Sequence, residues 1–421
     1  MNRGFYSVQL ILQNIRQLVT VAARGAFAKS GHAMRDLGVL DDATVLIEDG
    51  IIRWVGASSD FHEPSIADAT MLDCSELAAL PGFVDSHTHL LFAGSREDEF
   101  AMRVEGRSYQ EIADAGGGIL STVNATRAAS KKELKKLGRQ RLDDMLKLGT
   151  TTVEIKSGYG LTQDDEIKML EAINELAEEH YSTVVATFLG AHALPPEFAG
   201  NADGYVAVLC QRLLPYIAKR KLAAFCDAFC ETKYFTVAQT ETLFRAALAA
   251  GLKLKRHADQ LTQIGASKLG ASFHATSIDH LEKIDSDAME AIREAGSIAT
   301  VLPGVSFFLN YGYPPARQMI DSGLPIAIAT NFNPGSCMSF SMPMMMTIAC
   351  THMGLTPEEA LAAATVNGAA ALNLSHRIGS IEVGKEADII LYRIPHYRHL
   401  AYHFGVNHVE TIIKRGVILE F

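Results

Sequence analysis

The pattern of hydrophobic and polar positions divides the chain into three stretches. The first, up to about residue 75, contains short apolar or alternating runs such as VTVAA, ATVLIEDG and IIRWVGA. Asp49-Gly50, between the last two runs, is a typical two-residue hairpin turn. The C-terminal runs GSIEVGKEADIILY and VETIIKRGVILEF follow the same pattern. We therefore expect one small β-sandwich domain built from both termini, residues 1–77 and 368–421.

The central stretch, residues 78–367, alternates short apolar runs with longer amphipathic ones. TTTVEIKSGYG precedes DDEIKMLEAINELAEEH, and LKLKRHAD, SIDHL, SIATVLP and LPIAIATNFNP continue the series of strand-like runs. Strands that alternate with helices indicate a parallel sheet, and about eight such units predict an α/β fold with a closed (β/α)8 barrel. A doubly wound open sheet is the alternative, but no GxGxxG fingerprint follows the first strand.

Composition narrows the possible partners and the cellular location. The chain has 421 residues, of which 48% are hydrophobic, and a formal net charge of -10. This charge disfavours binding to nucleic acid or to an anionic membrane surface. The sequence has neither a bilayer-spanning apolar run nor the features of a signal peptide. The six scattered cysteines predict buried free thiols, which fits a reducing compartment, so we expect a cytoplasmic protein. From the charge and the lack of a spanning run, we expect neither a nucleic-acid nor a membrane partner.

The strongest signal for chemistry is PGFVDSHTHLLFAG, in which a strand-like run ends in His87-Thr88-His89. Residues two apart in a strand point to the same side, so both imidazoles can face one cation. Neutral imidazole is a common ligand of zinc and related metals. An isolated HxH also occurs on protein surfaces, so this pair alone does not establish a metal site.

Polar residues at the ends of later strand-like runs strengthen the metal hypothesis. They are Tyr159 after VEIKSG, His192 after TFLGA, His257 after LKLKR, His280 in SIDHL, and Asn331 and Asn333 after IAIAT. The carboxyl ends of barrel strands share one face, which is where (β/α)8 enzymes have their active sites. Histidines at four strand ends therefore predict a site for one divalent metal.

Lys156 and the remaining histidines have simpler interpretations. Some metal barrels carbamylate a strand-end lysine, but one metal suffices here, and Lys156 can instead pair with a carboxylate. His274 is expected to be solvated. No metal role is expected for the histidines of the helical and terminal regions, which are His352, His376, His396, His399, His403 and His408.

These residues resemble the amidohydrolase superfamily, and in particular its members that open an imidazolone ring in histidine degradation. The resemblance covers nearly the whole chain, through DSHTHLLFAGSREDEF, AGGGILSTVNATRAAS, GTTTVEIKSGYGL, GAHALPPE, HADQ, SIDHL, NFNPGS and FGVNHV. HxH is generic to the superfamily, whereas SGYGL, GGGILSTV and FNPGS together are much more specific. The resemblance implies a homodimer with one zinc or iron ion that hydrolyses 4-imidazolone-5-propanoate to N-formimino-L-glutamate.

The resemblance also assigns roles to residues. It implies metal ligation by His87, His89, His257 and Asn331, and catalysis by His192, Gln260, His280 and Asn331. It implies substrate binding by Arg96, Tyr109, Tyr159, His192, Gln260, His280, Asn333, Gly335 and Ser336.

The chemistry of lactam hydrolysis agrees with this assignment. A divalent metal activates water and polarises the carbonyl, and three histidine ligands leave room for that water. His280 is placed to orient or deprotonate the water, and His192 can stabilise the oxyanion. Arg96 offers a planar fork to the acid arm of the substrate, unless it pairs with Glu97 or Asp98. Tyr159 can donate to the same carboxylate or pack on the ring.

One position departs from the family pattern. Asn331 stands where the resemblance leads us to expect an aspartate that ligates the metal and transfers a proton. An amide oxygen can still coordinate weakly but cannot carry a proton, so we expect weaker metal binding, slower turnover or both. Gln260 is a lesser difference, because some related sequences have glutamate there and an amide can still hydrogen-bond the ring.

Two other functions stay open at this point. A related deaminase or cyclic-imide hydrolase would act on another heterocycle, but Arg96 with Tyr159 predicts an acid arm that nucleobases lack. A non-catalytic binding protein on the same scaffold is favoured only by Asn331.

Overall fold

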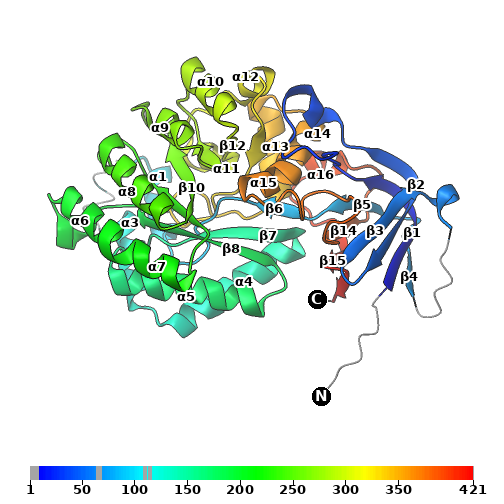
Figure 1. Cartoon of the computed structure of the whole chain (residues 1–421), viewed down its shortest axis with the longest axis horizontal. Coiled ribbons are helices and arrows are strands. Elements are labelled where there is room, and N and C mark those ends of the chain that lie inside the picture. Colours follow the sequence, from blue (N-terminus) through cyan, green and yellow to red (C-terminus); the bar gives the residue numbers. More distant parts are fainter. Residues whose placement is uncertain (1–8, 63–68, 108–110, 112–115, 421) are drawn as a thin grey trace.

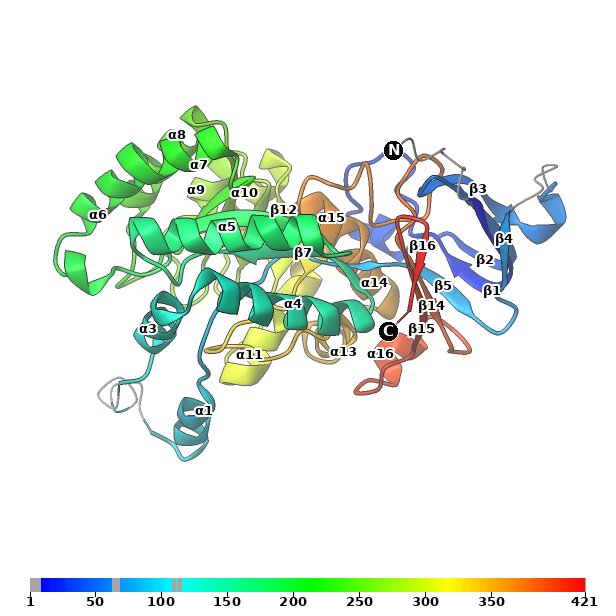
Figure 2. The same ribbon diagram turned by 90° about the horizontal axis from the view of Figure 1, so that it is seen from below.

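A computed structural model describes residues 9–62, 69–107, 111 and 116–420. A parallel barrel and a mixed sheet lie side by side, and the first and last strands of the chain meet in the mixed sheet (Figures 1 and 2). The expected α/β architecture, a (β/α)8 barrel with a β domain from both termini, is confirmed.

The mixed sheet has the order β16-β15-β14-β5-β1-β2-β3, and β4 pairs with β1. Its strands are β1 (Gln9–Val19), β2 (Val39–Glu48), β3 (Ile51–Ala57), β4 (Thr70–Asp73), β5 (Ala78–Pro81), β14 (Ile389–Tyr392), β15 (Val409–Lys414) and β16 (Val417–Leu419). The predicted hairpin joins β2 to β3, because Asp49 and Gly50 have the positive φ angles, 51° and 79°, that a type I′ turn needs. The strand predicted at VTVAA is wrong beyond Val19, where β1 ends and the chain turns through Val21 at a φ of 50°.

The barrel strands are all parallel and follow one another in chain order. They are β6 (Phe83–Asp85), β7 (Thr150–Lys156), β8 (Thr183–Ala191), β9 (Phe225–Ala228), β10 (Lys253–Ala258), β11 (Ser277–His280), β12 (Ile298–Val301) and β13 (Ile326–Ile328). Two bonds beyond the first and last strands close the ring: Asn331 N donates to His87 O at 2.9 Å, and His89 N donates to Phe332 O at 3.0 Å. Closure therefore brings the HxH segment and Asn331 to the same mouth.

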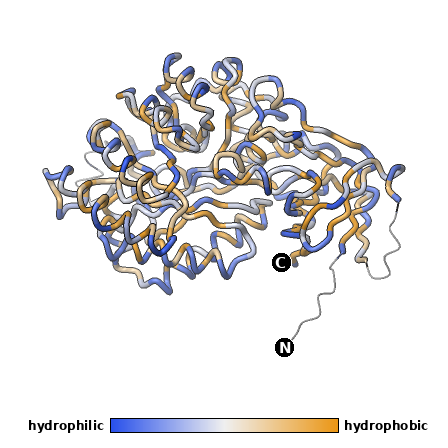
Figure 3. Tube along the Cα trace, in the orientation of Figure 1, coloured by the Kyte–Doolittle hydropathy of each residue, from blue (hydrophilic) through white to orange (hydrophobic). Residues whose placement is uncertain are grey.

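Helices connect the barrel strands and cover the outside of the barrel, and shorter ones lie between strands of the mixed sheet (Figure 1). They are α1 (Glu97–Val104), α3 (Ile119–Ala128), α4 (Lys131–Lys147), α5 (Gln163–Glu179), α6 (Ala202–Val208), α7 (Leu214–Arg220), α8 (Val237–Ala249), α9 (Ala266–Ser272), α10 (Ser286–Ala295), α11 (Pro303–Leu309), α12 (Ala316–Asp321), α13 (Met342–Met353), α14 (Pro357–Ala364), α15 (Val366–Ala371) and α16 (His399–Tyr402), with shorter turns η1 (Gly31–Arg35), η2 (Ser58–Asp60), η3 (Pro196–Phe198) and η4 (Leu209–Leu213). Capping boxes at Ser130–Glu133 and Thr236–Gln239 satisfy the first amides of α4 and α8. Hydrophilic residues lie along the outer rim of the helices and hydrophobic ones in the strands (Figure 3).

The cysteines and the helix lengths bear on two further expectations. All six cysteines are free, and Cys210 and Cys350 are partly exposed, whereas the other four are buried as expected. Among the described residues, no helix combines the length and apolarity that crossing a bilayer requires.

Candidate metal centre and active site

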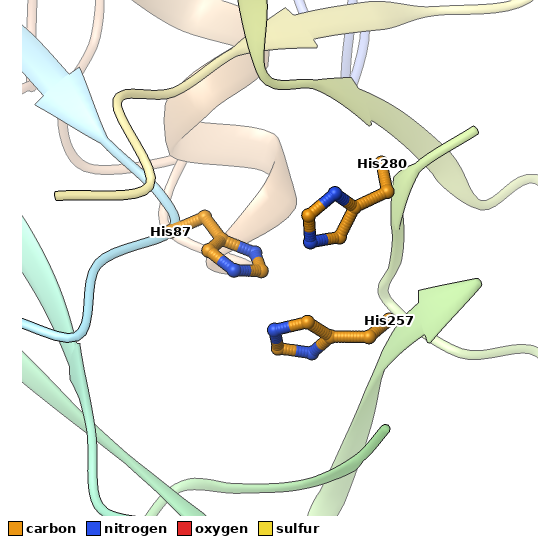
Figure 4. Close-up of side chains that lie close together, drawn as sticks. All are labelled: His87, His257 and His280. Carbon is orange, nitrogen blue, oxygen red and sulfur yellow. The ribbon is translucent and has the colours of Figure 1, made fainter. Parts of the chain in front are cut away.

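Four imidazoles converge at the carboxyl ends of the barrel strands. His87 and His89 follow β6, His257 lies on β10, and His280 ends β11. One ring nitrogen from each of His87, His257 and His280 lies within 4.8 Å of the other two, and Figure 4 shows the three side chains pointing toward one another. His89 Nε2 lies 3.4 Å from His257 Nε2. The barrel mouth therefore holds all three histidines that were predicted to ligate a metal.

Buried aspartates orient two of these rings. His87 Nδ1 lies 2.6 Å from Asp279 Oδ2, and His257 Nδ1 lies 2.8 Å from Asp227 Oδ2. A ring that donates its Nδ1 proton to a carboxylate presents the lone pair of Nε2 on its other side. His87 Nε2 is buried and has no partner among the described residues. Both rings are thus fixed in the tautomer that binds a metal through Nε2.

Lys156 links one of these aspartates to a further carboxylate. Its Nζ lies 2.7 Å from Glu154 and 2.9 Å from Asp227, and all three side chains are buried. Burial opposes the charge of Lys156, but Asp227 and Glu154 outweigh burial and raise its pKa. A carbamate forms only on a neutral amine, so this ammonium supports the simpler interpretation, in which Lys156 pairs with carboxylates.

Three imidazoles of the cluster, those of His87, His89 and His257, are held neutral by their surroundings. Burial lowers the pKa of His87 and His89 well below the ordinary value. Burial also lowers the pKa of His257 to about 4, although Asp227 opposes the shift. Neutral imidazole is the form that binds metal, so these rings need lose no proton near pH 7.

The donor atoms fit a divalent transition metal. His87 Nε2 and Asn331 Oδ1 are buried without a partner among the described residues, and His89 Nε2 faces His257 Nε2 at 3.4 Å. A buried polar atom left unpaired costs about 1–3 kcal/mol, and a cation between such acceptors removes that cost. Imidazoles suit zinc or iron, whereas calcium and magnesium prefer an all-oxygen set.

The loop after β13 orients the amide of Asn331. Asn331 Nδ2 donates to Ser336 Oγ at 3.1 Å, which leaves Oδ1 as the free end of the amide. Asn333 holds this loop together: its Nδ2 donates to Asn331 O and Ser336 Oγ, and its Oδ1 accepts from the backbone amides of Gly335 and Ser336. Asn333 and Ser336 thus act on the site through Asn331.

Asp227→Asn is expected to weaken zinc binding by about 10- to 100-fold, because an amide cannot both accept from His257 Nδ1 and neutralise Lys156. Zinc affinity is measured by competition with a chelator of known affinity. Asp143→Asn is the matched control, since Asp143 binds His180 at 3.0 Å outside the cluster. Equal zinc affinities of the two variants would contradict the proposed role of Asp227.

Tyr159 and His192 line the same mouth beside the metal ligands. The ring of His192 stacks on His89 with centroids 4.8 Å apart, and its centroid lies 5.3 Å from that of Tyr159. Burial raises the pKa of Tyr159, while the positive charges of Arg96 and Arg141 oppose this shift. The predicted substrate-binding tyrosine and histidine are therefore neighbours, and the charge of Arg96 acts on the tyrosine.

Arg96 pairs with an acid that the sequence did not single out. Its Nε and Nη2 donate to the two carboxylate oxygens of Glu99 at 2.9 and 2.6 Å, rather than to Glu97 or Asp98. Glu99 Oε1 also accepts from Gly118 N at 2.9 Å. The Nη1 side of Arg96 faces Gly335, where an added Cβ would lie 2.2 Å from Nη1. Gly335 thus leaves the space that this guanidinium occupies.

Gly335→Ala is expected to displace Arg96 and raise KM for an acid-armed substrate by about tenfold or more, since hydrogen bonds to charged groups contribute about 1.5–3 kcal/mol. Steady-state kinetics of Gly335→Ala, Arg96→Ala and the double variant measure the coupling. If the methyl group acts through Arg96, Gly335→Ala has no further effect on KM once Arg96 is alanine. A full additional loss in the double variant would contradict this route.

Of the two remaining predicted residues, the structure describes Gln260. Gln260 lines a cavity of about 260 Å³ together with Leu261, Glu282, Lys283, Tyr311 and Gly312. Tyr109 lies outside the described residues. The residues not predicted as part of the site are Asp227, Asp279, Glu99 and Glu282. For the two aspartates the available signal was a charged residue inside an apolar strand, in CDAFC and SIDHL.

Comparison with known proteins assigns this barrel and site to a class. The model of the amidohydrolase family matches residues 78–419. Among solved structures, an adenosine deaminase from Xanthomonas campestris with bound zinc superposes with a TM-score of 0.73 at 18% identity, covering 98% of this chain and 92% of the other. An atrazine chlorohydrolase from Arthrobacter aurescens complexed with zinc gives a TM-score of 0.68 at 16% identity, covering 97% and 95%. The chain belongs to the amidohydrolase family.

Curated relatives narrow the position within that family. The imidazolonepropionase of Parabacteroides distasonis is 46% identical over 409 residues, which cover 97% of this chain and 98% of the relative. The imidazolonepropionase of Geobacillus kaustophilus is 43% identical over 413 residues, which cover 97% of each chain. Within the amidohydrolases, the chain belongs with the imidazolonepropionases.

Proposed function

We propose that this chain hydrolyses the cyclic amide of 4-imidazolone-5-propanoate to N-formimino-L-glutamate. The observation that carries the proposal is that the histidine cluster, Tyr159 beside His89, and Arg96 beside Gly335 lie at one barrel mouth. The imidazoles supply a metal-dependent hydrolytic centre, and the guanidinium supplies a partner for an acid arm. The full-length similarity to imidazolonepropionases supports the same substrate.

In this reaction water attacks the ring carbonyl. The water oxygen bonds to the carbonyl carbon, the ring C–N bond breaks, and one water proton passes to the leaving nitrogen. His87, His89, His257 and Asn331 Oδ1 would hold a zinc or iron ion, which supplies Lewis-acid polarisation of the carbonyl and a lowered pKa of water. His280, whose ring centroid lies 5.2 Å from that of His257, is placed to orient the water and take its proton.

His192 fits a different role from the oxyanion donor predicted from sequence. Its Nδ1 donates to Gly158 O at 3.0 Å, and burial lowers its pKa to about 4, so the ring is neutral near pH 7. In that tautomer Nε2 is an acceptor. His192 would therefore accept the ring N–H of the substrate, and Gln260 would bind the ring from the cavity on its side of the mouth.

The other assignments follow the family resemblance. We propose one zinc or iron ion per chain, a homodimer and a cytoplasmic location. The similarity to imidazolonepropionases disfavours a deaminase that acts on an uncharged nucleobase. The proposed roles of Arg96 and Tyr159 disfavour it as well, because a nucleobase has no acid arm for them to bind.

The test is hydrolysis by the purified, zinc-loaded protein. Loss of imidazolone absorbance and appearance of N-formimino-L-glutamate by mass spectrometry are expected with 4-imidazolone-5-propanoate. Its propanamide analogue, which has no negative charge, is expected to be a much poorer substrate. Turnover of uncharged nucleobases alone would overturn the proposal.

A further inference from the structure

The cavity beside Gln260 contains one carboxylate that has no role in the proposed hydrolysis. Six residues line this cavity of about 260 Å³, and Glu282 is the acid among them. The Glu282 side chain is 1% exposed, and its Oε2 has no partner among the described residues. A buried carboxylate with a free oxygen at the edge of a reaction site calls for a functional explanation.

An unusual turn brings Glu282 back onto the catalytic histidine. His280 and Leu281 have φ angles of 85° and 71°, a conformation that residues other than glycine rarely adopt. Two backbone bonds hold the turn against the end of β10: Leu281 N donates to Ala258 O at 3.1 Å, and Lys283 N donates to Asp259 O at 2.8 Å. Strained backbone that is held in this way is concentrated at functional sites.

The turn places a carboxylate behind the ring of His280. Glu282 Oε1 lies 3.4 Å from His280 Nδ1. On the other side of this ring are His87 and His257, with centroids at 5.6 and 5.2 Å. The contact is long for a hydrogen bond, but such bonds in catalytic sites often shorten when substrate binds. The same arrangement, carboxylate to Nδ1, orients His87 and His257 through their aspartates.

We propose that Glu282 is a positioning residue for His280. By accepting from Nδ1–H, it fixes the tautomer in which Nε2 carries the lone pair that receives the proton of water. The role requires an acceptor at this place rather than a negative charge. This inference rests on the proposed function, because it assigns His280 the handling of water in that reaction.

Kinetics of three variants test the proposal. Glu282→Leu removes the acceptor and is expected to lower kcat by about 10- to 100-fold with KM changed less than about threefold. Glu282→Gln keeps an acceptor oxygen and is expected to retain kcat within about threefold of the unmodified protein. Glu294→Leu, at an exposed position of α10, is the control for loss of one charge. An unchanged kcat in Glu282→Leu would overturn the proposal, as would equal losses of kcat in Glu282→Gln and Glu282→Leu.

A second measurement does not depend on activity. Long-range ¹⁵N–¹H spectra of protein labelled at the histidine ring nitrogens report the tautomer of His280, whose signals are identified by their loss in His280→Asn. The spectra are expected to show protonated Nδ1 in the unmodified protein and in Glu282→Gln, and a shifted or mixed tautomer in Glu282→Leu. Identical spectra in all three would exclude the contact. If the unmodified protein fails to open the imidazolone ring, the proposed function fails while these spectra still test Glu282.

Discussion

Replacing His257 with alanine is expected to lower kcat/KM by on the order of 10³-fold or more and to reduce bound zinc well below one ion per chain. His257 is central to the cluster, with its ring centroid 4.5 Å from His87, 5.4 Å from His89 and 5.2 Å from His280. Its loss leaves the predicted ligand set with the two histidines that follow β6 and the neutral amide of Asn331. The measurements are elemental analysis and steady-state kinetics on the same preparation.

His274→Ala is the matched control for this variant. His274 is exposed, lies just before β11 and is absent from the cluster, so zinc content and kcat/KM should stay unchanged. If His257→Ala kept full zinc and full activity, the metal centre would lie elsewhere.

Introducing a carboxylate at position 331 is expected to raise kcat by about 100-fold, the lower end of what a positioned acid–base group contributes. The amide of Asn331 presents Oδ1 without a partner in a buried position, so it accepts but cannot take up a proton. In Asn331→Asp, the Ser336 hydroxyl can rotate and donate to the carboxylate, which keeps the side chain in place. The carboxylate also ligates a divalent metal more strongly than an amide oxygen does, so zinc affinity should rise with kcat.

The control for the backbone is Asn310→Asp. Asn310 has a φ of 54°, close to the 55° of Asn331, but it caps the C-terminus of α11 and is exposed. Its replacement should change neither kcat nor zinc affinity. A kcat of Asn331→Asp equal to or below that of the unmodified protein would mean that position 331 does not handle the proton.

The sequence predicted those parts of the site that depend on periodicity. Two-residue spacing places His87 and His89 on one side of an extended segment, and the ends of parallel strands bring His257 and His280 to the same face. In the structure His87, His257 and His280 lie together, and His89 Nε2 lies 3.4 Å from His257 Nε2. The strand pattern also predicted the hairpin at Asp49-Gly50, because few dipeptides adopt two successive positive φ angles.

Side-chain partners could not be predicted in the same way. Asp227 meets His257 across neighbouring strands, 30 residues apart, and Asp279 meets His87 across 192 residues, so their pairing depends on the register of the barrel. Arg96 was expected to bind the acid arm of the substrate, with a pair to Glu97 or Asp98 as the alternative. A helix that begins at Glu97 instead brings Glu99, three residues on, beside it. The turn that brings Glu282 onto His280 needs two positive φ angles at residues whose type does not indicate them.

The most direct test is a crystal structure of the zinc-loaded protein with 3-(imidazol-4-yl)propanoate, an analogue that lacks the hydrolysable carbonyl. Zinc anomalous scattering is expected to give one peak, about 2.1 Å from Nε2 of His87, His89 and His257, and the acid arm should lie within hydrogen-bond distance of Arg96. A peak away from these three nitrogens, or an acid arm directed away from Arg96, would contradict a metal-dependent hydrolase for an acid-armed imidazolone.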